Sequence, residues 1–247
     1  MKRYAIVGAT SAIAEHCARI WLTKEDLDLT LVARNKERAE SVVQDLRVRS
    51  PGSVIRIIEG DLVTPSSIED IVREICQAGD VDCVLIAHGS LPDQEACQND
   101  LARSANELSV NGISPALFAE AFANKMSISG RGQIGIIGSV AGDRGRKSNY
   151  IYGAAKGLLT RYAQGLQHRF AGTDVVITLV KPGPTQTPMT AHLSDEGPKM
   201  ADVTAVAQTI VNGMAKERPV VYAPGKWLII MMIIRHLPRF IFNRMDI

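Results

Sequence analysis

Short runs rich in Val, Ile and Leu alternate along this chain with longer stretches whose apolar residues recur at helical spacing. Near-continuous apolar runs are typical of parallel strands that helices cover on both faces. Segments with the character of such strands are residues 4–7, 29–33, 53–62, 82–89, 132–139, 174–183 and 219–225. Segments predicted to be helical are 11–24, 35–50, 66–79, a long region at 93–125 and one that starts near Tyr150.

This alternation predicts a doubly wound α/β fold of the Rossmann type, with a seven-stranded parallel sheet and helices on both faces. No Pro-, Ser- or Gly-rich linker and no internal repeat interrupts residues 1–225, which we interpret as one domain. Residues 226–247 form an apolar and basic C-terminal tail. Ligands of such sheets bind beyond the carboxyl ends of the strands, so the residues that follow each strand are candidates for chemistry.

The turn after the first strand, GATSAIA at residues 8–14, has the shape of a phosphate-binding loop. Of the three glycines usual in such a loop only Gly8 is present, and alanines occupy the other two positions. Free N–H groups at the start of the next helix suit a pyrophosphate, and Thr10 and Ser11 add hydroxyl groups. Taken alone, the turn does not distinguish a dinucleotide site from an ordinary strand-to-helix connection.

A second pattern involves Ser139, Tyr152 and Lys156. The tyrosine and lysine lie four residues apart in a predicted helix and share one face, and the serine ends a predicted strand. A free tyrosine is a poor acid or base at neutral pH, and a nearby ammonium lowers its pKa toward the working range. A serine hydroxyl can stabilise the charge that develops on a carbonyl oxygen. These residue types suit the proton transfer that accompanies reduction of a ketone.

This combination resembles the short-chain dehydrogenase/reductase family, whose pattern is a serine upstream of Tyr-x-x-x-Lys. Further motifs in the family's order extend the resemblance over nearly the whole chain: GDL at 60–62, AHG at 87–89, NELSVNG at 106–112 and KPGPTQTPM at 181–189. AHG departs from the family, which usually has Asn-Ala-Gly at that place. The variant turn at Gly8 is then interpreted as a dinucleotide site in which alanine replaces two glycines.

The resemblance implies roles for individual residues. Tyr152 is the expected acid/base, Ser139 binds the carbonyl oxygen, and Lys156 also holds the nicotinamide ribose. Asn111 is expected to hold a water molecule of the proton relay. The implied dinucleotide-binding residues are Gly8, Thr10, Ser11, Ala12, Ile13, Arg34, Asp61, Leu62, Ala87, His88, Gly89, Tyr152, Lys156, Pro182, Gly183, Thr185 and Thr187. The family also implies a homodimer or homotetramer.

The end of the second strand bears on the choice between NADP(H) and NAD(H). An acidic residue there would bind the ribose hydroxyls of NAD, but this chain has Arg34, whose planar fork suits a ribose phosphate. NADP(H) is therefore favoured. NAD(H) stays possible, because an arginine at the start of a charged helix is also a common solvent-facing residue, and the family's frequent basic residue at the position of Ser11 is absent.

Composition and cysteine usage exclude several classes. The net charge is +2 and aromatic residues are 5% of the chain, so no nucleic-acid partner is expected. The four cysteines and five histidines show no metal-ligand spacing, so we expect no metal and reduced thiols. His88 and His192 could line the pocket near the nicotinamide, but packed or solvated side chains are favoured. The N-terminus runs directly into a strand, which favours a cytoplasmic protein.

The tail contains eight consecutive apolar residues at 227–234, too few to span a bilayer. Basic residues surround this run, a mixture that suits a segment lying in the headgroup plane at the inner face of a membrane. The alternative is a core or subunit-interface helix, since tails in this family often complete the substrate pocket or pack across an oligomer. Pro238 is expected to break any helix that runs through the tail.

Within the family, SVAGDRGRKSNYIYGAAKG, PMTAHL and IIRHLPRFIF look most like the branch of decaprenylphosphoryl keto-pentose reductases. That branch implies reduction of a keto group on a polyprenyl-phosphate-linked sugar, the second half of a 2'-epimerisation in cell-envelope polysaccharide synthesis, with an oxidase partner. Arg144, Arg146 and Lys147 could attract the substrate phosphate or form a solvated loop. The alternatives are a reductase of a soluble carbonyl, such as a 3-oxoacyl thioester or small ketone, and a non-catalytic nucleotide-binding scaffold subunit.

Overall fold

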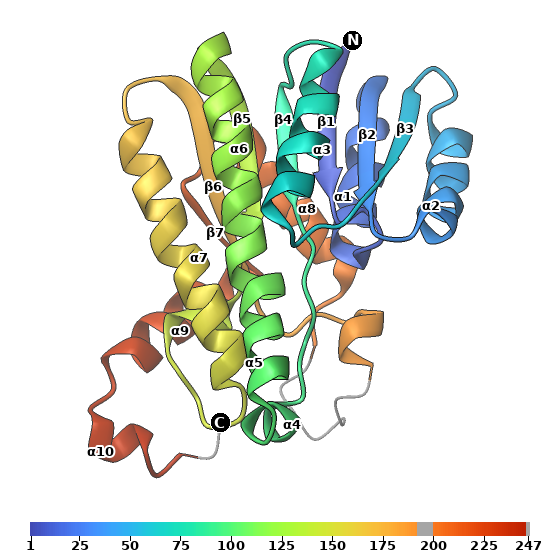
Figure 1. Cartoon of the computed structure of the whole chain (residues 1–247). Helices are drawn as coiled ribbons and strands as arrows, with labels where there is room; N and C mark the ends of the chain where they lie inside the picture. Colours follow the sequence, from blue (N-terminus) through green and yellow to red (C-terminus); the bar gives the residue numbers. More distant parts are fainter. Residues whose placement is uncertain (192–199, 246–247) are drawn as a thin grey trace.

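Seven parallel strands form one sheet in the order β3-β2-β1-β4-β5-β6-β7 (Figure 1). The computed structural model describes residues 1–191 and 200–245. The strands are β1 (Lys2–Val7), β2 (Leu27–Ala33), β3 (Val54–Glu59), β4 (Cys83–Ile86), β5 (Arg131–Ile137), β6 (Asp174–Pro182) and β7 (Val220–Ala223). The predicted Rossmann-type fold is confirmed, with strands at all seven predicted places.

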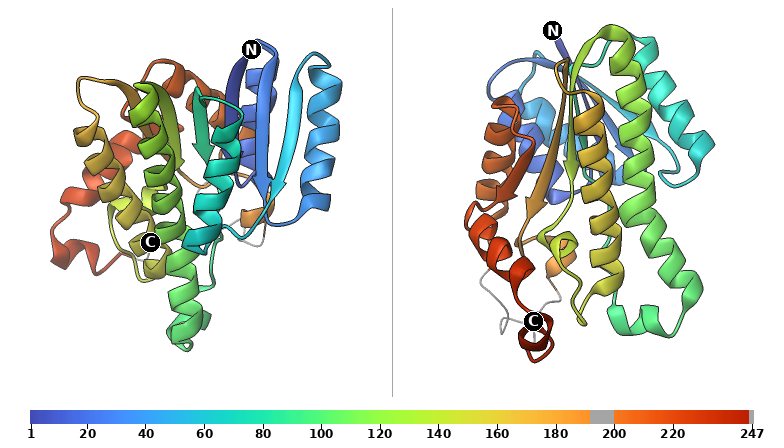
Figure 2. Two further views of the ribbon diagram at one scale, coloured as in Figure 1. Left: turned by 45° about the horizontal axis from the view of Figure 1, so that its top comes forward. Right: turned by 90° about the vertical axis from the view of Figure 1, so that its left-hand side faces the viewer.

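Helices cover both faces of this sheet (Figure 2). They are α1 (Ala12–Leu22), α2 (Lys36–Arg49), α3 (Pro65–Gln77), α4 (Gln94–Gln98), α5 (Leu101–Leu108), α6 (Ser114–Ser129), α7 (Tyr150–Arg169), α8 (Val203–Ala215), α9 (Lys226–His236) and α10 (Arg239–Phe242). Shorter helical turns are η1 (Ser109–Ile113, a π-helix), η2 (Val140–Asp143) and η3 (Pro188–Thr190). Helices α3, α6 and α7 bury one apolar cluster on the sheet, and α1, α2 and α8 bury a second on the other face.

The chain reverses direction across the sheet between β1 and β4, which are neighbours although two strands separate them in sequence. Both strands point their carboxyl ends to the lower edge of the sheet in Figure 1. In a doubly wound sheet this reversal opens the crevice in which ligands bind. The fold therefore places the predicted motifs along one edge of the sheet.

Some elements differ from the prediction. Strands β3 and β4 end earlier than predicted, at Glu59 and Ile86, because the motifs GDL and AHG turn away from the sheet as loops. Helix α8 was not predicted, since its many Val, Ala and Thr residues fit a strand or a helix. Asp202 starts this helix by accepting a hydrogen bond from the Ala205 N–H at 2.9 Å.

The tail lies beside β7 at the edge of the sheet and at the same end as the loops after the strands (Figure 2). Helix α9 ends at His236, and Pro238 then caps the short helix α10, so the expected break at this proline is confirmed. Within residues 1–191 and 200–245, no helix is long and apolar enough to cross a bilayer.

Candidate functional site

The turn after β1 fits a dinucleotide phosphate. Gly8 has φ +86°, and a Cβ on it would lie 2.5 Å from the backbone nitrogen of His88, so this position accepts only glycine. Helix α1 begins at Ala12 with Ser11 in the N-cap position, and the serine hydroxyl makes no capping hydrogen bond. The free N–H groups of the first turn of α1, which includes Ile13, therefore lie at the carboxyl edge of the sheet, where they suit a phosphate.

The two alanines of this turn have a structural reason. Ala12 is the first residue of α1, and Ala14 lies within the helix with its side chain fully buried in the core. Both positions are helical, and alanine stabilises a helix more than glycine does. The departure from the three-glycine pattern thus leaves the phosphate cradle intact, because only Gly8 needs a positive φ.

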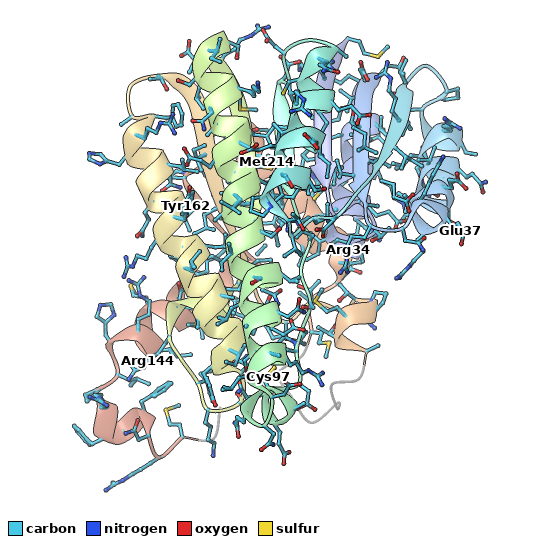
Figure 3. All side chains as sticks on the ribbon, in the orientation of Figure 1. Arg34, Glu37, Cys97, Arg144, Tyr162 and Met214 are labelled. Carbon is cyan, nitrogen blue, oxygen red and sulfur yellow. The ribbon has the colours of Figure 1, made fainter. Side chains whose placement is uncertain are left out.

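The residues predicted to bind the adenosine half follow β2 and β3. Arg34 and Thr10 are both exposed, and Arg34 directly follows the end of β2 (Figure 3). Asp61 accepts hydrogen bonds from the N–H groups of Val63 and Thr64, each at 3.0 Å, and from the Thr64 hydroxyl. The Thr64 hydroxyl is the largest cause that lowers the pKa of Asp61, and Arg34 adds to it. Asp61 is therefore ionised and held in place by its own loop.

His88 does not face the crevice with its side chain. Its Nε2–H donates to the Ser114 hydroxyl at 2.7 Å, and Ser114 in turn donates to the carbonyl of the buried Leu62. The ring packs edge-on against Phe118, and its Nδ1 is buried without a hydrogen-bond partner. His88 is a packed histidine that connects the AHG and GDL loops, and only its backbone lies against Gly8. His192 lies outside the described residues.

Because His88 is buried, we expect the protein to lose stability in acid. Burial lowers the pKa of His88 to about 3, whereas the unfolded chain binds this proton near the ordinary value of about 6.5. Between these pH values the unfolded state binds the extra proton, so the free energy of unfolding falls as pH falls, by up to about 1.4 kcal/mol per pH unit from this group. Urea unfolding as a function of pH measures this slope.

The matched variant is His88→Gln, whose amide can still donate to Ser114 but does not titrate. Its stability should fall less steeply in acid than that of the wild type over the same pH range, since all other groups are retained. Equal slopes for the two proteins would show that His88 is not the responsible group.

Asn111 lies in the π-helix η1 and is fully buried. Its Oδ1 accepts a hydrogen bond from the Ser90 N–H at 2.8 Å, and its Nδ2 donates to the Glu107 carboxylate at 3.0 Å and to the Ser90 hydroxyl at 3.0 Å. A Cβ on Gly89 would lie 2.8 Å from Asn111 Oδ1 and 3.7 Å from the Lys156 Nζ. The asparagine side chain therefore fixes the backbone that faces the lysine, and its expected role in the proton relay stays a prediction.

Glu107 and Ser90 are site residues that sequence reasoning missed. Both were visible in the sequence, within or beside the motifs NELSVNG and AHG. Their importance comes from the fold, because the loop after β4 and helix α5 bring them together. The carboxylate of Glu107 accepts hydrogen bonds from both Ser90 and Asn111. Only the one-turn spacing of Glu107 and Asn111 in a helix could have indicated the contact.

Ser139, Tyr152 and Lys156 are brought together at the end of β5. Ser139 follows this strand and accepts a hydrogen bond from the Ala141 N–H at 3.1 Å, while the other two lie on α7. Lys156 is 3% exposed, its Nζ donates to the Ile137 carbonyl at 3.1 Å, and it lies 5.6 Å from the centre of the Tyr152 ring.

Burial dominates the titration of this group. It lowers the pKa of Lys156 to about 8. It also raises the pKa of Tyr152 above its ordinary value, and the hydrogen bond with Ser139 opposes this rise only in part. The expectation that Lys156 lowers the pKa of Tyr152 is therefore not met by the protein alone, because burial stabilises the neutral phenol. A neutral phenol is the form that can donate a proton.

The end of β6 contributes the last predicted residues. Pro182 and Thr185 are buried, and the Thr185 hydroxyl donates to the carbonyl of Gly183 at 2.9 Å. Thr187 begins η3, where its N–H donates to the Thr190 hydroxyl at 3.1 Å. A Cβ on Gly183 would overlap the indole of Trp227, so glycine lets the first turn of α9 pack flat on this segment.

Comparison with known proteins agrees with this arrangement. A sequence profile described as short chain dehydrogenase matches residues 2–197. The chain belongs to the short-chain dehydrogenase family. It is 30% identical over 245 residues to an uncharacterized oxidoreductase of Streptomyces coelicolor, covering 97% of this chain and 94% of that protein. It is 30% identical over 224 residues to an uncharacterized oxidoreductase of Mycobacterium tuberculosis, covering 88% of this chain and 87% of that one.

Solved structures share the fold at low identity. A short-chain dehydrogenase from Sphingobium yanoikuyae in complex with NADPH has a TM-score of 0.82, with 23% identity and 97% of each chain covered. A short-chain dehydrogenase from Burkholderia cenocepacia in complex with NADP also has a TM-score of 0.82, with 17% identity, covering 99% of this chain and 98% of that one. The family and the fold make this chain an oxidoreductase, as predicted.

In this short-chain dehydrogenase the loop after Ser139 is anchored by a buried ion pair. Asp143 of η2 pairs with Lys181 of β6 and accepts a hydrogen bond from the Tyr222 hydroxyl of β7 at 2.7 Å. The side chains of Asp143 and Lys181 are 2% and 5% exposed. Burial and the hydrogen bond to Asp143 together raise the pKa of Tyr222. No sequence pattern indicates this cluster, since its members come from separate elements.

Arg144 connects the same loop to the tail (Figure 3). Its Nη1 donates to the carbonyls of Ile234 and Leu237 at 2.5 and 2.7 Å, and its guanidinium stacks 3.8 Å from the centre of the Phe242 ring. A cation at the carboxyl end of a helix satisfies its last carbonyls and its dipole. The suggestion that Arg144 attracts a substrate phosphate is thus corrected, because its guanidinium already binds the carbonyls and the Phe242 ring of the tail.

Proposed function

We propose that this oxidoreductase uses NADPH to reduce a keto group on a sugar carried by a polyprenyl phosphate. The observation that carries the proposal is the convergence of Ser139, Tyr152 and Lys156 at the end of β5, beside a phosphate cradle formed by the turn at Gly8. The apolar and basic tail that packs on Gly183 supports a lipid-linked substrate, because it stands at the edge of the same site.

The residues of the chain would act on the proton and the carbonyl oxygen. When bound, the dinucleotide supplies a hydride to the carbonyl carbon. Tyr152, a neutral phenol in this buried site, donates its proton to the carbonyl oxygen, and the Ser139 hydroxyl hydrogen bonds to that oxygen as negative charge develops. Loss of the proton leaves Tyr152 as a phenolate, and the ammonium of Lys156 stabilises this negative charge. Asn111 holds the loop that faces Lys156.

Cofactor choice gives a prediction for Arg34. Its exposed guanidinium at the end of β2 suits the ribose phosphate of NADP, and both family structures described above were solved with NADPH or NADP. Arg34→Ala should weaken NADPH binding by about 10- to 100-fold, the usual worth of a charge-assisted hydrogen-bond pair. NADH binding should change little and is the internal control. Fluorescence titration of both dinucleotides measures this, and an equal loss for both would contradict the role.

The substrate assignment is tested by turnover. Purified enzyme with NADPH is supplied with a polyprenylphosphoryl 2-keto-pentose in detergent, a 3-oxoacyl thioester or a small soluble ketone, and dinucleotide consumption is followed. We expect turnover of the lipid-linked sugar to exceed that of the other two. Turnover of a soluble ketone alone would assign the enzyme to soluble carbonyls instead. An oxidase that produces the ketone would be the partner enzyme.

The remaining parts of the proposal concern the location of the enzyme in the cell, metal binding and its oligomeric state. Four cysteines that form no disulfide suit a reducing compartment, so we place the enzyme in the cytoplasm, peripheral at the inner face of the membrane. Within the described residues no group of three or more His, Cys, Asp or Glu side chains is arranged to hold a metal. A homodimer or homotetramer is the assembly we expect, and light scattering measures it.

A further inference from the structure

The tail has apolar side chains on two sides, but the protein covers only one of them. Toward the body, Met231 is buried and Trp227 packs on Gly183. Away from the body lies a set of exposed apolar side chains that we call the tail face: Leu228, Ile229, Met232, Ile233, Phe240, Ile241 and Met245. Ile229 and Phe240 are 60% and 67% exposed. A helix that is apolar on all sides is normally buried, so we infer that another molecule covers the outer side of α9.

The charged residues of the tail sequence are basic, apart from Asp246. The basic residues of 226–245 are Lys226, Arg235, His236, Arg239 and Arg244, all exposed, and this stretch contains no Asp or Glu. None of these lysine and arginine side chains forms an ion pair with a described residue. The partner of the tail face should therefore combine an apolar interior with a negative surface.

We propose that the tail face docks on an anionic lipid surface, with α9 and α10 lying in the headgroup plane. Apolar side chains would enter the boundary of the acyl chains, and the surrounding cations would pair with lipid phosphates. The described helices cannot span a bilayer, which leaves an in-plane orientation. A second copy of the chain fits less well, because a two-fold interface would bring the same cations together.

Arg144 anchors the tail to the loop that follows Ser139. Arg144 fixes the end of α9 through two carbonyls and fixes α10 through Phe242, and this arginine lies five residues after Ser139. Figure 1 shows α9 and α10 at the end of the molecule to which the strands point their carboxyl ends. A protein docked through the tail face would present the carboxyl edge of its sheet to the membrane, where, on the proposed function, its lipid-linked substrate would lie.

Vesicle co-sedimentation of the full chain tests the docking without any substrate. The vesicles are phosphatidylcholine alone and phosphatidylcholine mixed with phosphatidylglycerol. We expect the wild type to bind the mixed vesicles and to be released by salt. Ile229→Ser combined with Ile233→Ser should weaken binding by about tenfold or more, because both side chains leave the apolar contact. Arg239→Gln combined with Arg244→Gln should weaken the preference for the anionic vesicles, since two of the cations of the tail are lost.

Ile128→Ser is the matched control, since Ile128 is 84% exposed but lies near the end of α6 away from the tail. It should bind vesicles like the wild type, and circular dichroism checks that every variant is folded. The proposal would be overturned if the wild type bound neither kind of vesicle, or if the serine variants bound the mixed vesicles as well as the wild type does. A dimer lost in the serine variants, with no lipid binding, would assign the face to a second copy. None of these outcomes decides the reductase activity, which is measured separately.

Discussion

Tyr152→Phe is expected to lower kcat for ketone reduction by about 10³-fold, within the usual contribution of a general acid. The variant removes only the phenolic oxygen, so the ring keeps its place over Lys156, and dinucleotide affinity should stay near that of the wild type. The large effect is expected because the site offers a neutral phenol beside the Ser139 hydroxyl, and burial keeps it protonated. Steady-state kinetics and a dinucleotide titration on the same protein measure both quantities.

Tyr150→Phe is the control for this variant, because Tyr150 lies two residues earlier on the same helix and is exposed. It should retain full activity. If Tyr152→Phe instead supported full turnover, or complemented the gene's function in cells, the catalytic assignment would fail. The scaffold alternative, in which the chain binds a nucleotide without chemistry, would then be preferred.

Asp143→Ala should lower the free energy of unfolding by about 3–5 kcal/mol, the usual effect of leaving a buried charge without its partner. The charge left behind is the Lys181 ammonium, and the Tyr222 hydroxyl loses its acceptor at the same time. For a chain of this size such a loss lowers Tm by about 10 °C. Thermal unfolding followed by circular dichroism measures it.

Two further variants separate this effect from a generic loss of charge. Asp143→Leu combined with Lys181→Met replaces the pair with apolar groups and should recover most of the stability. Asp70→Ala breaks an exposed ion pair with Arg73 and should cost less than about 1 kcal/mol. A similar small cost at Asp143 would show that the pair does not stabilise the fold.

The sequence allowed the architecture to be predicted because each strand is a local pattern. Apolar runs and the motifs that follow them fixed the parallel sheet, its seven strands and the edge at which Gly8, Ser139 and Pro182 gather. The four-residue spacing of Tyr152 and Lys156 places both on one helix, as α7 has them. These features depend on residues that are close in sequence.

Features that depend on distant residues could not be predicted. Arg144 is a basic loop residue in the sequence, and nothing there says that it binds carbonyls at residues 234 and 237. The orientation of His88 depends on Ser114, and the anchor of Asn111 depends on Ser90 of another loop. Expected dinucleotide contacts such as those of Arg34 stay predictions, since they depend on a ligand.

The packing of Trp227 on Gly183 affects how the tail can be studied. Cutting the chain after Gly225 would strip an indole from the backbone beside the crevice and take away the carbonyls that hold Arg144. A shortened protein could then lose activity even if lipids play no part in catalysis. Exchange of the tail between relatives would carry the same ambiguity unless residue 227 and the Arg144 contacts were kept. The outer side chains of α9 are the parts that can be altered one at a time without opening the site.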